Sequence, residues 1–240
     1  MTGCALNVPP PKTAVEAAEP SEAAWARVLD ARVDERGRID FEGLRKTPGD
    51  LDLYVAWVGA VSPRSSPGSF PTPASRLAYW INAYNALAMY DAIRSGIPES
   101  LADRKFRFFY RDRMVVGGER MSLYALENRI IRPLGDPRVH FALNCMVRGC
   151  PRLPRVPFDA ARLDAQLDEA ARLFLNEERN VALDPASRVV RFNEILRFYT
   201  RDFLARAESL IGYANLYRSD TIPVDWKVRF IPYDWTLNRQ

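Results

Sequence analysis

The clearest hydrophobic pattern in the chain is a helical one between residues 74 and 94. Apolar side chains such as Leu77, Ile81 and Ala88 recur there at spacings of three and four, which places them on one face of an α-helix. Similar patterns predict further helices, most of which begin at a Ser, Asp or Asn that can cap a helix. They cover about residues 21–29, 49–60, 122–131, 159–176 and 193–203.

Short extended segments are expected between these helices. Residues 113–116 and 119–121 flank Gly117-Gly118, a pair that favours a two-residue hairpin turn. Residues 139–145 are mostly apolar and predict an interior strand, and residues 189–192 predict another. The chain is therefore expected to adopt a mainly helical α+β fold, a single domain with a small, mostly antiparallel sheet.

Charge is interleaved along the chain, with 34 Lys and Arg against 30 Asp and Glu and a formal net charge of +4. The one strongly basic patch is residues 105–113, where basic and aromatic residues alternate. This alternation is typical of a half-buried strand with a solvated face. The alternative is a patch that meets phosphates or an acidic surface.

Composition excludes several classes of protein. Of the 240 residues, 48% are apolar, enough for one large core. The sequence contains no run of about 18 apolar residues, the length that a membrane-spanning helix requires. Neither a nucleic-acid-binding motif nor a glycine-rich phosphate loop occurs. We expect no nucleic-acid partner and no cofactor, and a small molecule or a peptide as the substrate.

The first residues, Met1-Thr2-Gly3-Cys4, resemble the end of a bacterial lipobox, in which a small residue precedes a lipidated cysteine. The proline-rich residues that follow are typical of a flexible tether. This interpretation predicts that the sequence starts inside a signal peptide, with the tether in residues 1–20 and the domain in residues 21–240. The protein would then be a periplasm-facing lipoprotein, held at the outer membrane only through Cys4. The alternative is an ordinary N-terminus with a chance cysteine.

Several motifs, taken in order, resemble the domain-of-unknown-function 547 family over residues 21–238. They are Trp80–Leu87, Ser122-Leu123 with Glu127, Arg138–Cys145, Gly149-Cys150-Pro151 and Tyr233–Asn238. One departure is Ile131-Arg132, where the family pattern has Leu-Arg. The family occurs in bacteria, often as exported proteins, and the resemblance implies no settled activity.

The candidate chemistry lies between His140 and Cys150. His140 is the single histidine of the chain, and histidine is the side chain whose ordinary pKa suits acid–base chemistry near pH 7. In a strand, His140 and Asn144 would share one face, whereas Cys145 would point to the core on the other. Cys150 follows in a loop, stiffened by Pro151, that can fold back over the His140 face.

These residues suggest a catalytic triad with Cys150 as the nucleophile, His140 as the base and Glu127 as the group that orients the imidazole. Arg148 would favour the thiolate of Cys150 and lower its pKa. Asn144 or Asn82 would donate a hydrogen bond to the oxyanion. We therefore expect a cysteine-dependent hydrolase or acyl transferase that acts on amide or thioester bonds in the cell envelope.

Alternatives remain for each of these groups. Cys145 and Cys150 are a disulfide candidate in an exported, non-catalytic binding or scaffold domain. Cys150 could also be an unreactive buried thiol, or join His140, Cys145 and Glu127 around zinc, although a ligand on the opposite strand face argues against zinc. Asn82 and Asn85 lie three apart on one helix face, and either pin a neighbouring loop or polarise a substrate carbonyl. The candidate binding residues are Asn82, Asn85, Asn144 and Arg148.

Overall fold

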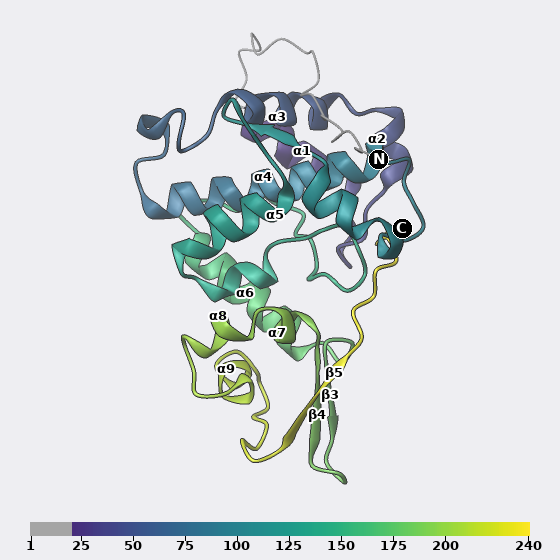
Figure 1. Cartoon of the computed structure of the whole chain (residues 1–240), viewed down its shortest axis with the longest axis vertical. Coiled ribbons are helices and arrows are strands. Elements are labelled where there is room, and N and C mark those ends of the chain that lie inside the picture. Colours follow the sequence, from purple (N-terminus) through teal and green to yellow (C-terminus); the bar gives the residue numbers. More distant parts are fainter. Residues whose placement is uncertain (1–20) are drawn as a thin grey trace, which may run out of the picture.

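Helix α4 (Pro73–Arg94) is buried on all sides from Leu77 to Ala92 and forms the centre of the larger core. It begins at Thr72, whose hydroxyl accepts a hydrogen bond from the backbone of Ser75 while the Ser75 side chain bonds back. The structure is a computed structural model that describes residues 21–240 (Figure 1). The predicted lipobox at Cys4 and the tether in residues 1–20 lie outside the described residues.

The N-terminal helices cover α4 from one side (Figure 1). They are α1 (Ser21–Arg32), α2 (Phe41–Lys46) and α3 (Gly49–Ala60). Helix α1 packs on α3, and α3 packs in turn on α4. The helices predicted for residues 49–60 and 74–94 are therefore confirmed almost to the residue. A short 3₁₀-helix, η1 (Pro67–Ser69), interrupts the loop between α3 and α4.

Residues 105–111 are helical, so the predicted strand is wrong. The 3₁₀-helix η2 (Ala102–Arg104) leads into the π-helix η3 (Arg107–Arg111). Phe106 and Tyr110, four residues apart, stack with their ring centroids at 5.7 Å, and Phe108 is buried. Alternation of basic and aromatic residues does not distinguish this short helix from a strand, and the exposed side chains here include the aromatic Phe106 and Tyr110.

The predicted hairpin is confirmed as β1 (Met114–Val116) and β2 (Glu119–Met121), which pair antiparallel. Gly117 and Gly118 have positive φ angles of 56° and 82°, as a tight hairpin turn requires. Ser122 caps the next helix, as predicted, by accepting from the N–H of Ala125. That helix is α5 (Leu123–Leu126), and it continues as the π-helix η4 (Glu127–Ile131) and the 3₁₀-helix η5 (Arg132–Leu134).

The interior strand predicted for residues 139–145 is also wrong. The chain forms the 3₁₀-helix η6 (Pro137–Phe141), and an irregular buried loop follows it through Cys150. The polar backbone of this loop is paired by side-chain amides and by the C-terminal segment rather than by a neighbouring strand. The expected alternation of faces therefore does not apply to His140, Asn144 and Cys145.

The second half of the chain forms a smaller core at the lower end of the molecule (Figure 1). Helix α6 (Leu163–Asn176) starts four residues after the predicted cap Asp159, which instead accepts from Ala161 in a turn. The helix predicted for residues 193–203 is split in two. The remaining helices are α7 (Ile195–Phe198), α8 (Thr200–Leu204) and α9 (Leu210–Asn215).

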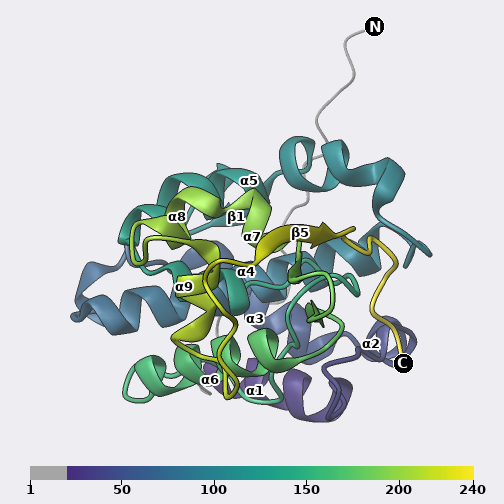
Figure 2. The same ribbon diagram turned by 90° about the horizontal axis from the view of Figure 1, so that it is seen from below.

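A three-stranded sheet completes this part, in the order β3-β4-β5. Its strands are β3 (Val181–Asp184), β4 (Val189–Asn193) and β5 (Lys227–Ile231). Strand β4 pairs antiparallel with β3 and parallel with β5. Seen from below, β5 runs toward the C-terminal end of the chain (Figure 2). The described chain is thus an α+β domain, mainly helical with two small sheets, as expected.

Within residues 21–240, no helix combines the length and the apolar composition that a membrane crossing requires.

Candidate functional site

A small cavity of about 60 Å³ brings together polar side chains from separate stretches of the chain. It has room for a few water molecules or a small acyl group. The exposed ring of Phe198 also lines it, so the cavity reaches the surface there. We name it the thiol cavity. Its polar wall consists of Tyr84, Glu127, His140, Cys145, Cys150, Tyr199 and Tyr233.

Three hydrogen bonds converge on the sulfur of Cys150. The backbone N–H of Cys145 donates to it at 3.1 Å, and the hydroxyl of Tyr233 lies at the same distance. The sulfur of Cys145 is also 3.1 Å away. A thiolate accepts hydrogen bonds far better than a neutral thiol does, so these donors favour ionised Cys150.

The two thiols consequently differ in acidity. Burial by itself would raise the pKa of Cys150, but the hydrogen bonds from Cys145 and Tyr233 outweigh it and lower the pKa below that of an ordinary cysteine. The pKa of Cys145 is raised well above its usual value, first by its hydrogen bond to Cys150 and then by burial. Cys145 is therefore a donor, and Cys150 is the more nucleophilic of the two sulfurs.

The imidazole of His140 is held by Asp202, not by Glu127 as predicted. Its Nε2 lies 2.8 Å from a carboxylate oxygen of Asp202, and Arg132 donates to both oxygens of that carboxylate at 2.7 and 2.8 Å. The guanidinium of Arg132 and then the imidazole hold the pKa of Asp202 well below its usual range. Asp202 is thus an ionised acceptor, which places the proton of a neutral imidazole on Nε2.

The other imidazole nitrogen, Nδ1 of His140, is buried and has no hydrogen-bond partner among the described residues. The ring stacks on that of Tyr199, with centroids 3.7 Å apart and an interplanar angle of 14°. This stacking fixes the plane of the ring. With Nε2 donating to Asp202, Nδ1 carries the lone pair and is able to accept a proton.

Glu127 is buried in the wall of the same cavity, at the start of η4. It is paired with tyrosines rather than with histidine: the hydroxyl of Tyr84 lies 3.4 Å from its carboxylate, and Tyr199 also hydrogen bonds to it. Burial, followed by the charge of Glu127, raises the pKa of both tyrosines well above the usual value. Both hydroxyls therefore stay neutral donors to this carboxylate.

The predicted binding amides hold loops in place. Asn85 donates to the carbonyl of Ala142 at 3.0 Å and accepts from the N–H of Asn144 at 2.8 Å. Asn144 in turn donates to the carbonyl of Pro151 and accepts from the N–H of Met146, both at 2.7 Å. These amides are committed to the backbone of the loop that carries Cys145 and Cys150.

Asn82 acts in the same way on a different loop. Its amide donates to the carbonyl of Phe158 and accepts from the N–H of that residue and from the indole N–H of Trp25. The sequence left two interpretations of Asn82 and Asn85, namely that they hold a neighbouring loop or that they polarise a substrate carbonyl. The observed hydrogen bonds match the first of these.

The C-terminal segment holds the other side of the cysteine loop. The backbone N–H of Arg148 donates to Thr236 at 2.8 Å. The N–H of Gly149 donates to Asp234, also at 2.8 Å. Gly149 is required here by close approach, because a Cβ atom at this position would lie 2.9 Å from the ring of Tyr233. The contact sets Tyr233 against the two sulfurs.

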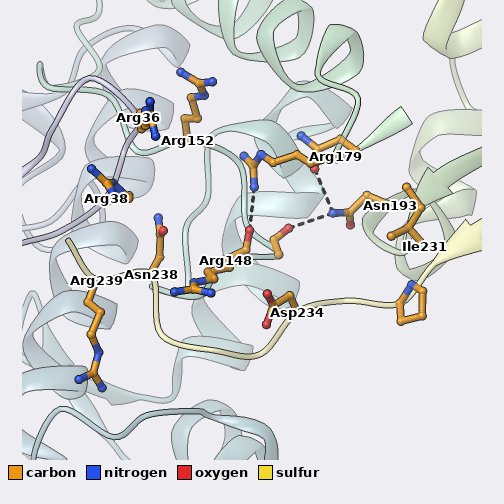
Figure 3. Close-up of a pocket in the computed structure, with 13 residues that line it drawn as sticks. Arg36, Arg38, Arg148, Arg152, Arg179, Asn193, Ile231, Asp234, Asn238 and Arg239 are labelled. Carbon is orange, nitrogen blue, oxygen red and sulfur yellow. Dashed lines mark hydrogen bonds between the residues drawn. The ribbon is translucent and has the colours of Figure 1, made fainter. Parts of the chain in front are cut away.

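Arg148 does not act on the thiol. Its side chain lies in the wall of a separate, arginine-rich cavity (Figure 3). The pKa of Cys150 is instead lowered by the neighbouring hydrogen bonds, those from Cys145 and Tyr233 above all. The prediction for Arg148 is therefore wrong, because its side chain leaves the backbone on the other side of the loop.

The alternatives for the cysteines can be stated in distances. Cys145 and Cys150 are free and their sulfurs are 3.1 Å apart, beyond the bond length of about 2.05 Å in a disulfide. Within residues 21–240, no three His, Cys, Asp or Glu side chains form a group that could hold a metal ion. The four residues proposed for zinc all line one cavity. The argument that Cys145 points away from the other three therefore does not hold.

Sequence reasoning missed several residues of this site. Tyr84 and Tyr233 lie inside the motifs that were recognised, but no feature of the sequence marked their hydroxyls as donors. Tyr199 and Asp202 are three apart in a helical stretch, a spacing that places them on one side. That spacing was the signal that could have identified them, although nothing in it points to His140.

Residues 69–175 match the model of a protein family described as "Protein of unknown function, DUF547". This segment contains α4 and the loop of Cys145 and Cys150, and it supports the domain family indicated by the motifs. Tyr233 and Asp202 lie outside the matched segment. Neither a curated protein nor a solved structure matches the chain.

Proposed function

We propose that the chain, whose residues 69–175 match the DUF547 family model, is a cysteine-dependent hydrolase or acyl transferase. Cys150 is the nucleophile and His140 the base, while Asp202 orients the imidazole. The observation that carries the proposal is the convergence of three donors on the sulfur of Cys150, inside a cavity that His140 also lines. Donors that lower the pKa of a thiol are typical of reactive cysteines.

The reaction proceeds in two steps. His140 takes the proton of the Cys150 thiol on Nδ1, and the thiolate attacks the carbonyl of an amide or a thioester to form a C–S bond. The C–N or C–S bond to the leaving group then breaks as His140 returns that proton to it. Water or an acceptor then attacks the thioester while His140 takes its proton, and the thiolate is released. Glu127 is a second carboxylate in the same wall, hydrogen-bonded by tyrosines.

The donors to the sulfur also serve the oxyanion in this proposal. Once the sulfur is acylated it is a poor acceptor, so the hydroxyl of Tyr233 and the N–H of Cys145 become free beside the reacting carbon. This role replaces the one predicted for Asn144 and Asn82, whose amides are committed to backbone groups.

Acyl trapping tests the proposal. The protein is incubated with a small activated ester such as p-nitrophenyl acetate, and peptide mass spectrometry locates the acetyl group. We expect the adduct on Cys150, its loss in Cys150→Ser and slower hydrolysis of the adduct in His140→Gln. Cys145→Ser is the matched control, because it removes the neighbouring thiol and leaves the nucleophile. An adduct distributed equally over Cys145 and Cys150, or no adduct, would refute the proposal.

A second candidate is a non-catalytic binding or scaffold domain in which Cys145 and Cys150 form a disulfide. The specific observation in its favour is the 3.1 Å separation of the sulfurs. Alkylation under denaturing conditions, followed by intact-mass measurement, separates the candidates. Both thiols react in the catalytic case, whereas neither reacts without prior reduction if the bridge is present.

We further propose that the protein works in the cell envelope as a lipoprotein anchored through Cys4. The support is the resemblance of residues 1–4 to the end of a lipobox. Expressing the gene with its upstream codons and analysing Cys4 for attached lipid tests this location. An unmodified product in the cytosol would contradict it.

A further inference from the structure

A second cavity, of about 560 Å³, lies on the far side of the cysteine loop. We name it the arginine cavity, after the six arginines in its wall: Arg36, Arg38, Arg148, Arg152, Arg179 and Arg239. They come from the turn after α1, the cysteine loop, the turn before β3 and the C-terminus. Figure 3 shows Arg36, Arg38 and Arg239 on one side, Arg179 on the other and Arg148 between them.

Only part of this positive charge is neutralised by the protein. Arg38 pairs with Asp34, and Arg152 and Arg179 share the carboxylate of Glu177. Asp234 is the acidic residue in the wall itself, and its carboxylate accepts from the backbone N–H of Thr236. Six guanidinium groups therefore face three carboxylates, which leaves an excess of three positive charges around one cavity.

Two of the six arginines are free to bind. Among the described residues, the guanidinium groups of Arg36 and Arg148 have no ion-pair or hydrogen-bond partner, and that of Arg239 bonds only to the carbonyls of Ile97 and Pro98. Guanidinium groups remain charged at every physiological pH and pair with phosphates or carboxylates through two parallel hydrogen bonds.

The walls between these arginines are polar and hydrogen-bonded. Asn193 donates to the carbonyl of Gly149 at 3.1 Å and to Asn180 at 3.2 Å. Arg179 donates to the carbonyl of Arg148 at 2.7 Å, which holds the cysteine loop in this wall. Gathering like charges in this way costs free energy unless an anion compensates them. The volume is in the range typical of small-molecule sites.

From this excess charge, its free guanidinium groups and the shape of the cavity, we propose that the arginine cavity binds a small anionic molecule that carries at least two phosphate or carboxylate groups. The site is independent of the chemistry proposed for Cys150. The backbone of Gly149 lies in its wall, whereas the neighbouring Cys150 lines the thiol cavity. One loop thus separates the two cavities.

Titration calorimetry with the full chain at constant ionic strength tests the site, with inorganic pyrophosphate and citrate as separate probes. The test variant is Arg36→Gln with Arg148→Gln, which should fold normally because neither guanidinium has a partner among residues 21–240. The matched control is Arg120→Gln with Arg201→Gln, two exposed arginines on β2 and α8 that remove the same charge elsewhere. Thermal unfolding confirms that both variants are folded.

We expect saturable binding of one molecule per chain, weakened at least about tenfold in the Arg36/Arg148 variant and unchanged in the control. Tighter binding of pyrophosphate assigns the site to phosphate groups, and tighter binding of citrate assigns it to carboxylates. Absence of saturable binding for both probes would overturn the proposal. Equal weakening in both variants would also overturn it, because it would show attraction by net charge alone.

Discussion

The hydroxyl of Tyr233 lies 3.1 Å from the sulfur of Cys150, although the two residues are 83 positions apart. The same hydroxyl is 3.5 Å from the sulfur of Cys145. Burial raises the pKa of Tyr233 well above its usual value, so the phenol stays protonated and donates. The acidity of Cys150 therefore depends on a residue near the C-terminus of the chain.

Tyr233→Phe should raise the pKa of Cys150. Losing one hydrogen bond to a charged acceptor corresponds to a rise of about 1 to 2 pH units and about a tenfold slower alkylation near pH 7. Iodoacetamide labelling across pH, quantified on the Cys150 peptide, measures the change. Tyr124→Phe, at a more exposed tyrosine outside the thiol cavity, is the control. An unchanged labelling profile in Tyr233→Phe would show that the hydroxyl does not stabilise the thiolate.

Gly149→Ala should act on the same contact from the backbone side. The added methyl group would lie 2.9 Å from the ring of Tyr233 and from the backbone nitrogen of Asp234. We expect a loss of about 1 to 3 kcal/mol in unfolding free energy together with slower labelling of Cys150. Gly68→Ala is the matched control, because nothing lies within 4 Å of its added methyl group. Equal effects of the two substitutions would contradict the close approach at Gly149.

Asp202→Asn should destabilise the protein near neutral pH. Its carboxylate joins His140 and Arg132, and its pKa in the folded protein lies well below the usual value. Such a depressed pKa stabilises the fold above the unfolded pKa of about 4, and the stabilisation is lost as pH falls toward the folded pKa. For a partly buried bidentate pair we expect about 2 kcal/mol at pH 7.

Urea denaturation of Asp202→Asn and of the wild type at pH 7 and at pH 3 measures this difference. The difference in unfolding free energy between the two proteins should be smaller at pH 3 than at pH 7. Asp220→Asn, at an exposed position, should show no gap at either pH. A gap for Asp202→Asn that is independent of pH would rule out the ion pair as its cause.

Asp91 should have the opposite pH dependence. Burial, followed by the charge of Asp112, raises the pKa of Asp91 to about 7, and one of its carboxylate oxygens has no partner among the described residues. A raised pKa stabilises the fold below the unfolded value of about 4, and this contribution is lost as pH rises through about 7. The unfolding free energy should fall by as much as about 4 kcal/mol as pH rises from about 4 to above 7.

Asp91→Asn should remove this dependence and make the protein more stable than the wild type at pH 8. Thermal or urea unfolding between pH 4 and pH 8 measures it, with Asp103→Asn at an exposed position as the control. If the stability of the Asp91→Asn variant still falls over this range as it does in the wild type, the pKa of Asp91 is not the cause.

Local sequence patterns predicted secondary structure correctly where a helix has regularly spaced apolar residues or where a turn depends only on its own residues. The spacing of apolar residues in 49–60 and 74–94 and the hairpin at Gly117-Gly118 were correct. Residues 139–145 were misread because an apolar run is compatible with a strand and with a buried loop. The hydrogen-bond partners of the backbone decide whether a strand or a loop is formed. Here those partners include Asn85 and residues near the C-terminus.

The catalytic hypothesis shows the same division. His140 and Cys150 were identified from the sequence because residue type limits which side chains can act as base and nucleophile. The partners that set their chemistry, Asp202 and Tyr233, lie 62 and 83 residues away from them. Hydrogen bonds that shift a pKa act over about 3 Å. The separation of two residues along the sequence does not indicate whether they lie that close in the fold.

The sequence by itself thus determined the mainly helical α+β fold and most helix positions, and it singled out the stretch from His140 to Cys150 as the candidate site. The tertiary structure decided that Cys145 and Cys150 share one cavity, that Asp202 holds the imidazole, and that Arg148 joins a separate cluster of arginines. The physical reason is that helix periodicity and residue chemistry are local, whereas burial, hydrogen bonding and charge in a cavity arise only when distant segments pack together.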